Sequence, residues 1–187
     1  MAERADPRIK GFQGNSKYRK KLFERYEYCN QYIRDKVVLD IPCGVGWGTH
    51  LLKGPRERHA VDIAPDAIEY GKHTYPGISF KIGDMSSIPY GNNIFDVVIC
   101  LEGYEHVNKT TQLKFISEAQ RVLISGGLII LTTPILENGK STGNKFHIHE
   151  PSYEEIHDTL NSNFETLVFD LFQGPDSKEI RFVGKVI

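Results

Sequence analysis

The sequence predicts an α/β protein built on a doubly wound sheet of seven strands, mostly parallel and ending in an antiparallel hairpin. Two observations predict this fold class. Short apolar runs alternate with helix-length amphipathic segments along most of the chain, which is the pattern of strand–helix units with right-handed crossovers. Near the end of the chain, two strand-like runs are separated only by a short turn, and strands joined in that way run antiparallel.

The first elements precede and follow a glycine-rich turn. A leading helix is expected over roughly Ser16–Arg34. The strands that follow are rich in Val, Ile and Leu without polar alternation, as expected for strands covered on both faces of a parallel sheet. These expected strands are Val37–Ile41, His59–Ile63, Ile78–Ile82, Val97–Leu101 and Leu128–Thr132.

Helices are expected between these strands, at Gly46–Lys53, Pro65–Thr74 and Lys109–Val122. Pro65 suits the first position of a helix, and an acid such as Asp66 favours the same helix end. The tail is expected to form a helix and a hairpin, over Tyr153–Leu160, Glu165–Phe172, a turn at Gly174–Pro175, and Arg181–Ile187. No linker divides the chain, so we expect one domain over 1–187, with 1–35 as a helical lid and 135–150 as a loop on the substrate side.

Charge and composition limit the classes of partner. The 187 residues include 23 Lys and Arg against 24 Asp and Glu, a net charge of −1. This balance gives no overall field for binding nucleic acid, so we do not expect a nucleic-acid partner. A basic stretch runs from Lys10 to Arg25, and we interpret it as a solvated helix face, with a nucleic-acid patch as the alternative.

The cysteines and apolar runs bear on location. Three cysteines without close pairing fit a reducing compartment and provide no zinc framework. The N-terminal segment lacks the apolar stretch of a signal peptide, and the longest apolar runs are strand-sized, so we expect no membrane span. We therefore expect a cytoplasmic protein. The sequence carries no signal for oligomeric state.

The segment VVLDIPCGVGWG, residues 37–48, is a strand followed by a glycine-rich turn. Gly44, Gly46 and Gly48 allow a tight bend and a close approach to a ligand. Dinucleotide-binding enzymes use a similar turn. Here, however, the glycines are spaced GxGxG rather than GxGxxG, and the carboxylate of Asp40 just before the turn would repel a pyrophosphate. A nicotinamide-dependent dehydrogenase is therefore the least favoured interpretation.

Asp62 ends the second expected strand, about 20 residues beyond the glycine turn, where an acid can accept both hydroxyls of a ribose. The alternative is an acid that serves the N-terminus of the next helix. Its position directly after a strand favours the ribose role.

Several segments, in order, resemble the motifs of class I S-adenosylmethionine (SAM)-dependent methyltransferases, which have a Rossmann-like fold. They are VVLDIPCGVGWG, HAVDIA, Gly83-Asp84-Met85, FDVVICLE and RVLISGGLIILTTP, followed by the terminal hairpin. The closest likeness is to small type-11 and type-12-like members, including quinone-pathway and glycan-associated O-methyltransferases. The resemblance implies SAM as the cofactor, bound by Asp40, Gly44, Gly46, Asp62, Ile63, Gly83, Asp84, Met85 and Glu102. One residue departs from the pattern, because Pro42 stands where the family has Gly or Ala and should stiffen the turn.

The fourth strand leads into Glu102, Glu105 and His106, at the strand ends where ligands of open α/β sheets bind. The spacing E-x-x-E-H brings the three side chains to one face if this stretch turns helically. Two carboxylates and an imidazole suit a divalent cation, and Mg²⁺ held by Glu102, Glu105 and His106 would lower the pKa of a substrate hydroxyl. The alternative is a site without metal, in which His106 packs, caps or acts as a base.

The same string resembles ubiquinone-pathway O-methyltransferases and small-RNA 2′-O-methyltransferases, in which a later histidine completes a metal site. His147 and His149 are the later histidines here, with a structural loop as the alternative role. A hydroxyl nucleophile must lose a proton, so His106, His147, His149 and Glu102 are the catalytic candidates. No Asn/Asp-Pro-Pro-Tyr/Phe signature of amino-group methylation follows the fourth strand, which favours oxygen as the acceptor atom.

These patterns predict methyl transfer from SAM to a hydroxyl of a small molecule or glycan. Two alternatives stay open: a metal-dependent RNA 2′-O-methyltransferase, and a SAM-binding protein without catalysis.

Overall fold

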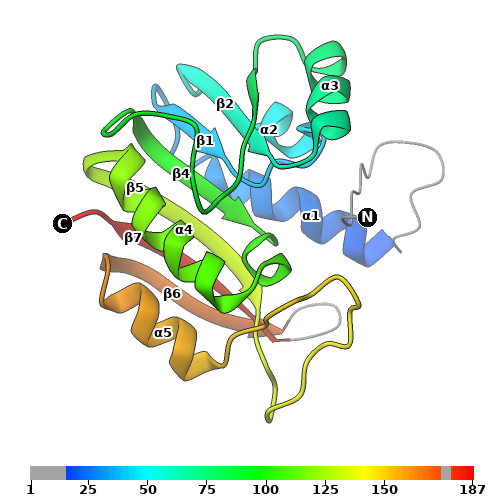
Figure 1. Cartoon of the computed structure of the whole chain (residues 1–187), viewed down its shortest axis with the longest axis vertical. Coiled ribbons are helices and arrows are strands. Elements are labelled where there is room, and N and C mark those ends of the chain that lie inside the picture. The colour runs from blue at the N-terminus through cyan, green and yellow to red at the C-terminus, as the bar shows by residue number, and fades with distance from the viewer. Residues whose placement is uncertain (1–15, 174–177) are drawn as a thin grey trace.

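The computed structural model describes residues 16–173 and 178–187, and the predicted alternation of strands and helices runs through them (Figure 1). The first part of the chain forms α1 (Ser16–Cys29), β1 (Val37–Asp40), α2 (Trp47–Leu51), β2 (Glu57–Asp62), α3 (Pro65–Thr74) and β3 (Ser79–Ile82). The second part forms β4 (Phe95–Leu101), η1 (Tyr104–His106), α4 (Lys109–Val122), β5 (Leu123–Pro134), α5 (Tyr153–Asn161), β6 (Glu165–Gln173) and β7 (Lys178–Lys185).

The strands of the described residues form one seven-stranded sheet in the order β3-β2-β1-β4-β5-β7-β6. Strands β1 to β5 are parallel. Strand β7 lies between β5 and β6 and is antiparallel to both. This topology confirms the predicted fold class. The turn expected at Gly174–Pro175 lies outside the described residues.

Some element bounds differ from those expected. The leading helix ends at Cys29 rather than Arg34, because the chain turns there and buries Ile33 under the sheet. Strand β5 begins at Leu123, immediately after α4, because Leu123 already pairs with Phe95 before the register between β4 and β5 shifts.

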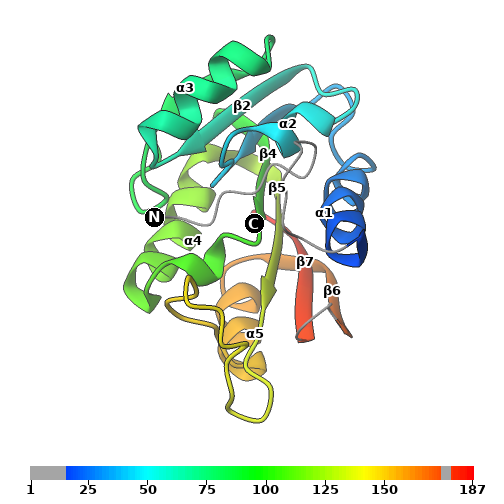
Figure 2. The same cartoon turned by 90° about the vertical axis from the view of Figure 1, so that its right-hand side faces the viewer.

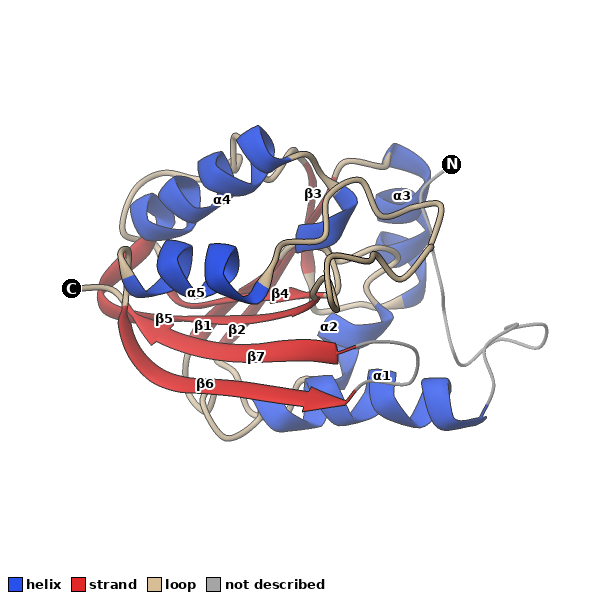
Figure 3. Ribbon diagram, turned by 90° about the horizontal axis from the view of Figure 1, so that it is seen from below, coloured by secondary structure: helices blue, strands red, loops and turns tan. Residues whose placement is uncertain are grey.

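The core divides into two layers, one on each face of the sheet. Figures 2 and 3 show α4 on one side of the sheet and α1 on the other. Neighbouring residues of the central strands supply opposite layers: Leu39 and Val98 join the cluster under α4 and α5, whereas Val38 and Val97 join the cluster under α1 to α3. The strands are therefore apolar on both faces, which explains the absence of polar alternation in the sequence.

Two further findings concern the environment of the protein. Within the described residues, every helix is too short or too polar to cross a bilayer. The cysteines Cys29, Cys43 and Cys100 are free and buried.

Candidate functional site

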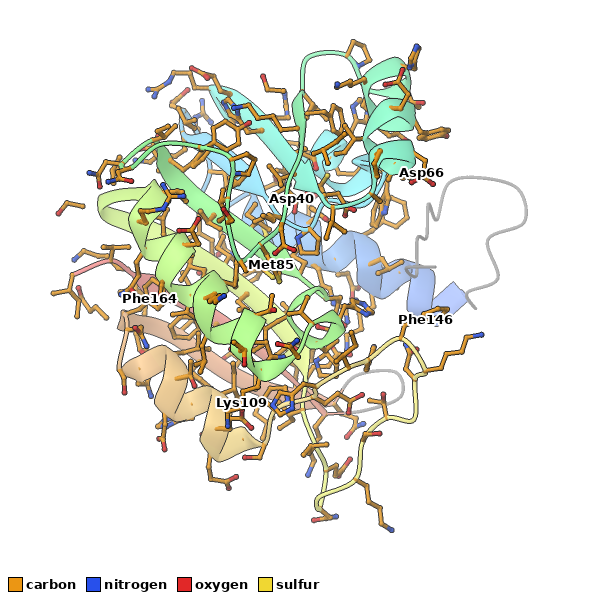
Figure 4. All side chains as sticks on the ribbon, in the orientation of Figure 1. Asp40, Asp66, Met85, Lys109, Phe146 and Phe164 are labelled. Carbon is orange, nitrogen blue, oxygen red and sulfur yellow. The ribbon has the colours of Figure 1, made fainter. Side chains whose placement is uncertain are left out.

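A cavity of about 940 Å³ lies where β1, β2 and β4 end. Its walls come from α1, the turn after β1, the ends of β2 and β4, the segment after β3, η1, the loop 135–152 and the start of β7. Figure 4 labels residues from two of these walls, Met85 after β3 and Phe146 on the loop. The site thus occupies the position at which open α/β sheets bind ligands.

Of the three glycines in the turn, Gly44 is the one that faces the cavity. Its φ is +54°, and a Cβ there would meet no atom within 4 Å. The other two glycines are required by packing, since a Cβ on Gly46 would overlap the ring of Phe80 and one on Gly48 would overlap the ring of Tyr26. Gly44 therefore leaves room for a ligand, whereas Gly46 lies behind the cavity wall.

Pro42 also lines the cavity, and its ring packs closely against Gly103, where any Cβ would overlap it. Pro42, at a position where the family usually has Gly or Ala, is thus accommodated because the neighbouring residue after β4 is a glycine.

The carboxylate of Asp62 anchors the turn to the end of β2. One oxygen accepts a hydrogen bond from the backbone N–H of Gly44 at 2.8 Å, and the other accepts one from Ala64 at 2.9 Å. Each carboxylate oxygen has more than one acceptor direction, so Asp62 can still accept two hydroxyls. Asp62 borders the cavity at the end of β2.

Ile63, Asp84 and Met85, three of the predicted cofactor-binding residues, border the same cavity. The side chain of Ile63 is 62% exposed although it lines the cavity, whereas Met85 is buried. Asp84 accepts the backbone N–H of Ser86 at 2.7 Å, which fixes its carboxylate. An apolar side chain exposed to a cavity beside a fixed carboxylate suits a ring with an exocyclic amine.

Asp40 is fully buried beneath the cavity and is not one of its lining residues. Its Oδ2 accepts hydrogen bonds from Thr49 Oγ1 at 2.6 Å and from the Tyr26 hydroxyl at 3.2 Å. Its Oδ1 has no hydrogen-bond partner among the described residues. Burial raises the pKa of Asp40 to about 7. An orphaned buried acceptor beside a ligand cavity fits a cationic ligand group, reached directly or through water.

Glu102 follows β4 and adopts a strained backbone conformation, with φ at +52°. Its carboxylate accepts a hydrogen bond from Thr132 at 2.8 Å and pairs with Arg25 of α1, also at 2.8 Å. Burial raises the pKa of Glu102, and the positive charge of Arg25 partly opposes that rise. Strain of this kind in a non-glycine residue is typical of functional sites.

Arg25 also pairs with Glu179 of β7 at 2.8 Å, and Lys21 joins the same carboxylate at 3.0 Å. The wall formed by α1 is thus held to the sheet by a buried ion-pair network that includes Glu102.

Glu105, His106 and His147 come together, each with one ligand atom within 4.8 Å of those of the other two. Glu105 is buried, its Oε2 accepts a hydrogen bond from Thr133 at 3.0 Å, and burial raises its pKa well above the usual range. His106 donates from Nδ1 to the carbonyl of Phe146 at 3.0 Å. His147 donates from Nδ1 to Glu150 at 2.5 Å. In each neutral ring, Nε2 is then the acceptor atom.

His149 is directed elsewhere. Its Nε2 lies 3.0 Å from Glu155 of α5, its carbonyl accepts a hydrogen bond from Gln112 of α4, and it does not line the cavity. Between the two later histidines, the structure brings His147 to the predicted cluster and leaves His149 on the far side of the loop.

Sequence analysis missed several residues that line or support the cavity: Tyr26, Arg25, Glu179, Glu150 and Ile148. Arg25 and Glu179 are 154 positions apart, and no local pattern connects them. Glu150 could have been found from its spacing, three residues after His147 in a predicted cavity loop.

Comparison with known proteins agrees with this geometry. Residues 39–131 match a family described as a methyltransferase domain. A Mycobacterium tuberculosis protein named as a probable S-adenosylmethionine-dependent methyltransferase is 29% identical over 178 residues, which cover 88% of this chain and 64% of that protein. The chain therefore spans less than two thirds of the length of this relative.

Solved structures show the same fold. The PH0226 protein of Pyrococcus horikoshii has a TM-score of 0.76 at 19% identity, with 93% of each chain covered. The [4+2]-cyclase SpnF has a TM-score of 0.77 at 15% identity, covering 97% of this chain and 84% of that one. These likenesses support the architecture, and the cyclase shows that the architecture alone does not define one reaction.

Proposed function

Because the chain belongs to the class I SAM-dependent methyltransferases, we propose that it transfers the methyl group of SAM to a hydroxyl oxygen of a small molecule or glycan. The observation that carries this proposal is the cavity at the strand ends. Asp62 and Gly44 both line it, and the Asp62 carboxylate fixes the turn by accepting a hydrogen bond from the backbone N–H of Gly44. In this proposal, Asp62 binds the ribose, Ile63, Gly83, Asp84 and Met85 surround the adenine, and Gly44 borders the methionine part. Asp40, buried beneath the cavity, binds the ammonium group of the methionine part through its unpartnered Oδ1, directly or through water.

SAM supplies an activated methyl group, so the protein mainly aligns the acceptor and excludes water. Helix α1 within the predicted lid 1–35 and the loop 135–150 form the acceptor side in this proposal. The acceptor hydroxyl must lose its proton, and the candidate base is Nε2 of His106, or Nε2 of His147 once it exchanges its hydrogen bond with the Asn144 amide at 3.0 Å. Both rings line the cavity, whereas His149 does not. In this proposal, Glu102 orients the hydroxyl.

Isothermal titration with SAM and S-adenosylhomocysteine tests the proposal. We expect micromolar binding to the wild type and loss of most of that affinity in Asp62→Ala. Asp158→Ala is the matched control, because Asp158 is an exposed carboxylate of α5 outside the cavity. Absence of binding to the wild type would exclude the cofactor role. Binding without methyl transfer to any hydroxylated acceptor in a labelled-SAM screen would instead support the SAM-binding protein without catalysis.

A metal-assisted reaction is the second candidate, and the cluster of Glu105, His106 and His147 favours it. In this version His147 replaces Glu102, whose carboxylate is already paired with Arg25. Two imidazoles and one carboxylate suit a borderline ion such as Mn²⁺ or Zn²⁺ better than the all-oxygen preference of Mg²⁺. The ion would lower the pKa of the acceptor hydroxyl.

Titration of the SAM-bound protein with Mn²⁺, Zn²⁺ and Mg²⁺ tests this candidate. His147→Ala should abolish the binding of the first two ions, and His149→Ala should leave it unchanged. If no ion binds, the candidate fails, and with it the metal-dependent RNA 2′-O-methyltransferase. A filter-binding assay at low salt tests RNA affinity separately.

The cytoplasmic location stays a prediction. Three free, buried cysteines are consistent with a reducing compartment.

A further inference from the structure

The lining of the cavity includes four apolar side chains: Leu22 of α1, Val107 after η1, and Phe146 and Ile148 of the loop 135–152. We refer to these four residues and the space between them as the acceptor half. At about 940 Å³, the whole cavity is near the upper end of the ~300–1,000 Å³ usual for ligand sites. It is therefore large enough for an acceptor beside the cofactor.

The polar groups that border the acceptor half are already engaged with one another. Glu179 pairs with Lys21 and Arg25. The Glu102 carboxylate pairs with Arg25 and accepts from Thr132. Each of these carboxylates already serves a neighbouring charge or hydroxyl, so a substrate with many hydroxyls would have to share acceptors that are engaged, and each buried hydroxyl left unpaired is costly.

The cavity-lining histidine of the loop, His147, is also within hydrogen-bond distance of neighbouring side chains. His147 lies within hydrogen-bond distance of Glu150 and Asn144, at 2.5 and 3.0 Å. Thr142 donates to Glu150 from both its backbone and its hydroxyl. These polar side chains of the loop are bonded to one another, whereas Lys145, which also lines the cavity, lies over the ring of Phe146 at 5.0 Å.

Ile148 is the clearest of these apolar side chains. It is 67% exposed although it lines the cavity. Its backbone N–H donates to the carbonyl of Glu105 at 2.9 Å, which pins this part of the loop to η1. At the other end of the same cavity, Ile63 is exposed to a similar degree, 62%. Removing exposed apolar surface from water is favourable, so each isoleucine gains from an apolar ligand face.

We propose that the methyl acceptor is an apolar molecule, a ring system or a hydrocarbon chain, that carries its reacting hydroxyl at one end. The apolar body lies against Ile148, Phe146, Val107 and Leu22, and the hydroxyl reaches Glu102 and the histidines. This inference rests on the proposed function and narrows the acceptor to one of the two classes that function allows, excluding polyhydroxylated sugars.

The experiment is isothermal titration of the protein saturated with S-adenosylhomocysteine, using 2-naphthol as the apolar probe and methyl glucoside as the sugar probe. We expect 2-naphthol to bind and methyl glucoside not to bind. Ile148→Ser should weaken 2-naphthol binding about tenfold or more, without changing the affinity for S-adenosylhomocysteine. Leu171→Ser is the matched control, since Leu171 is an exposed leucine of β6 that does not line the cavity.

The outcomes separate the two proposals. If S-adenosylhomocysteine binds but 2-naphthol does not, or if Leu171→Ser weakens 2-naphthol as much as Ile148→Ser, the apolar acceptor is refuted and the proposed function stands. Binding of methyl glucoside in preference to 2-naphthol would also overturn it. If S-adenosylhomocysteine itself does not bind, the proposed function fails first.

Discussion

Asp40 combines burial with an unsatisfied oxygen, and the two together make ligand binding depend on pH. Its pKa is raised to about 7 by burial, so the carboxyl is partly protonated near neutrality. A bound ammonium group favours the ionised form, and binding must then expel the proton. We expect the affinity for S-adenosylhomocysteine to fall as the pH drops from 8 to 6, by at most about tenfold per pH unit. Titration calorimetry at several pH values measures this change.

Asp40→Asn is the control for that prediction, because an amide does not titrate in this range. The variant should bind more weakly at pH 8 and lose most of the pH dependence. An identical pH profile in the wild type and in Asp40→Asn would show that another group is responsible.

Two glycines of the turn should respond differently to the same change. Gly48→Ala places a Cβ against the ring of Tyr26, so we expect a loss of about 1–3 kcal/mol of stability, although alanine normally favours a helix. Gly44→Ala meets no atom, and its φ of +54° adds strain of about 1 kcal/mol, but its methyl group enters the space of the ligand. Gly48→Ala should therefore lose more stability in urea unfolding, whereas Gly44→Ala should lose more affinity for S-adenosylhomocysteine in titration calorimetry. If Gly48→Ala stabilises the protein, the packing interpretation is wrong.

At the scale of elements, Arg25 adds a polar link between α1 and the sheet to the apolar packing of Leu22, Tyr26 and Cys29. The guanidinium bridges Glu102 after β4 and Glu179 at the start of β7, both at 2.8 Å. Arg25→Ala would leave two buried carboxylates without this partner, which typically costs about 3–5 kcal/mol. Lys20→Ala on the same helix removes only an exposed pair with Glu24 and should change stability by less than about 0.5 kcal/mol. Urea unfolding of both variants measures the difference, and equal effects would contradict the role of Arg25.

For the molecule as a whole, the sequence predicts the parts whose signals are local. The apolar strands, the glycine turn and Asp62 are short patterns with a fixed place in the fold, and the structure confirms the topology that they imply. The pairing of Arg25 with Glu179 depends on the packing of α1 against β7, elements at opposite ends of the chain. The choice between His147 and His149 depends on how one irregular loop turns, and periodicity does not fix that. The sequence also could not show that the absence of a side chain at Gly46 makes room for the ring of Phe80 rather than for a ligand.

The pH dependence of global stability follows from the buried acids together. Burial raises the pKa values of Asp40, Glu102 and Glu105 above their values in the unfolded chain. Between those unfolded values and the folded ones, the folded state holds more protons than the unfolded state, so stability falls as the pH rises. Glu118 and Glu155, whose pKa values are lowered, affect stability only below about pH 4.5.

We therefore expect the ligand-free protein to be more stable at pH 5 than at pH 8. Over this range Asp40 contributes at most about 3 kcal/mol, because its folded pKa of about 7 lies about two units above pH 5 and each unit corresponds to about 1.4 kcal/mol. The measurement is the urea midpoint at pH 5, 6, 7 and 8, and Asp40→Asn should flatten the decline. A wild-type midpoint that rises over this range would mean that Asp40 is ionised in the folded protein throughout. Its unpartnered oxygen would then already be satisfied by water or by a neighbouring donor before any cofactor binds.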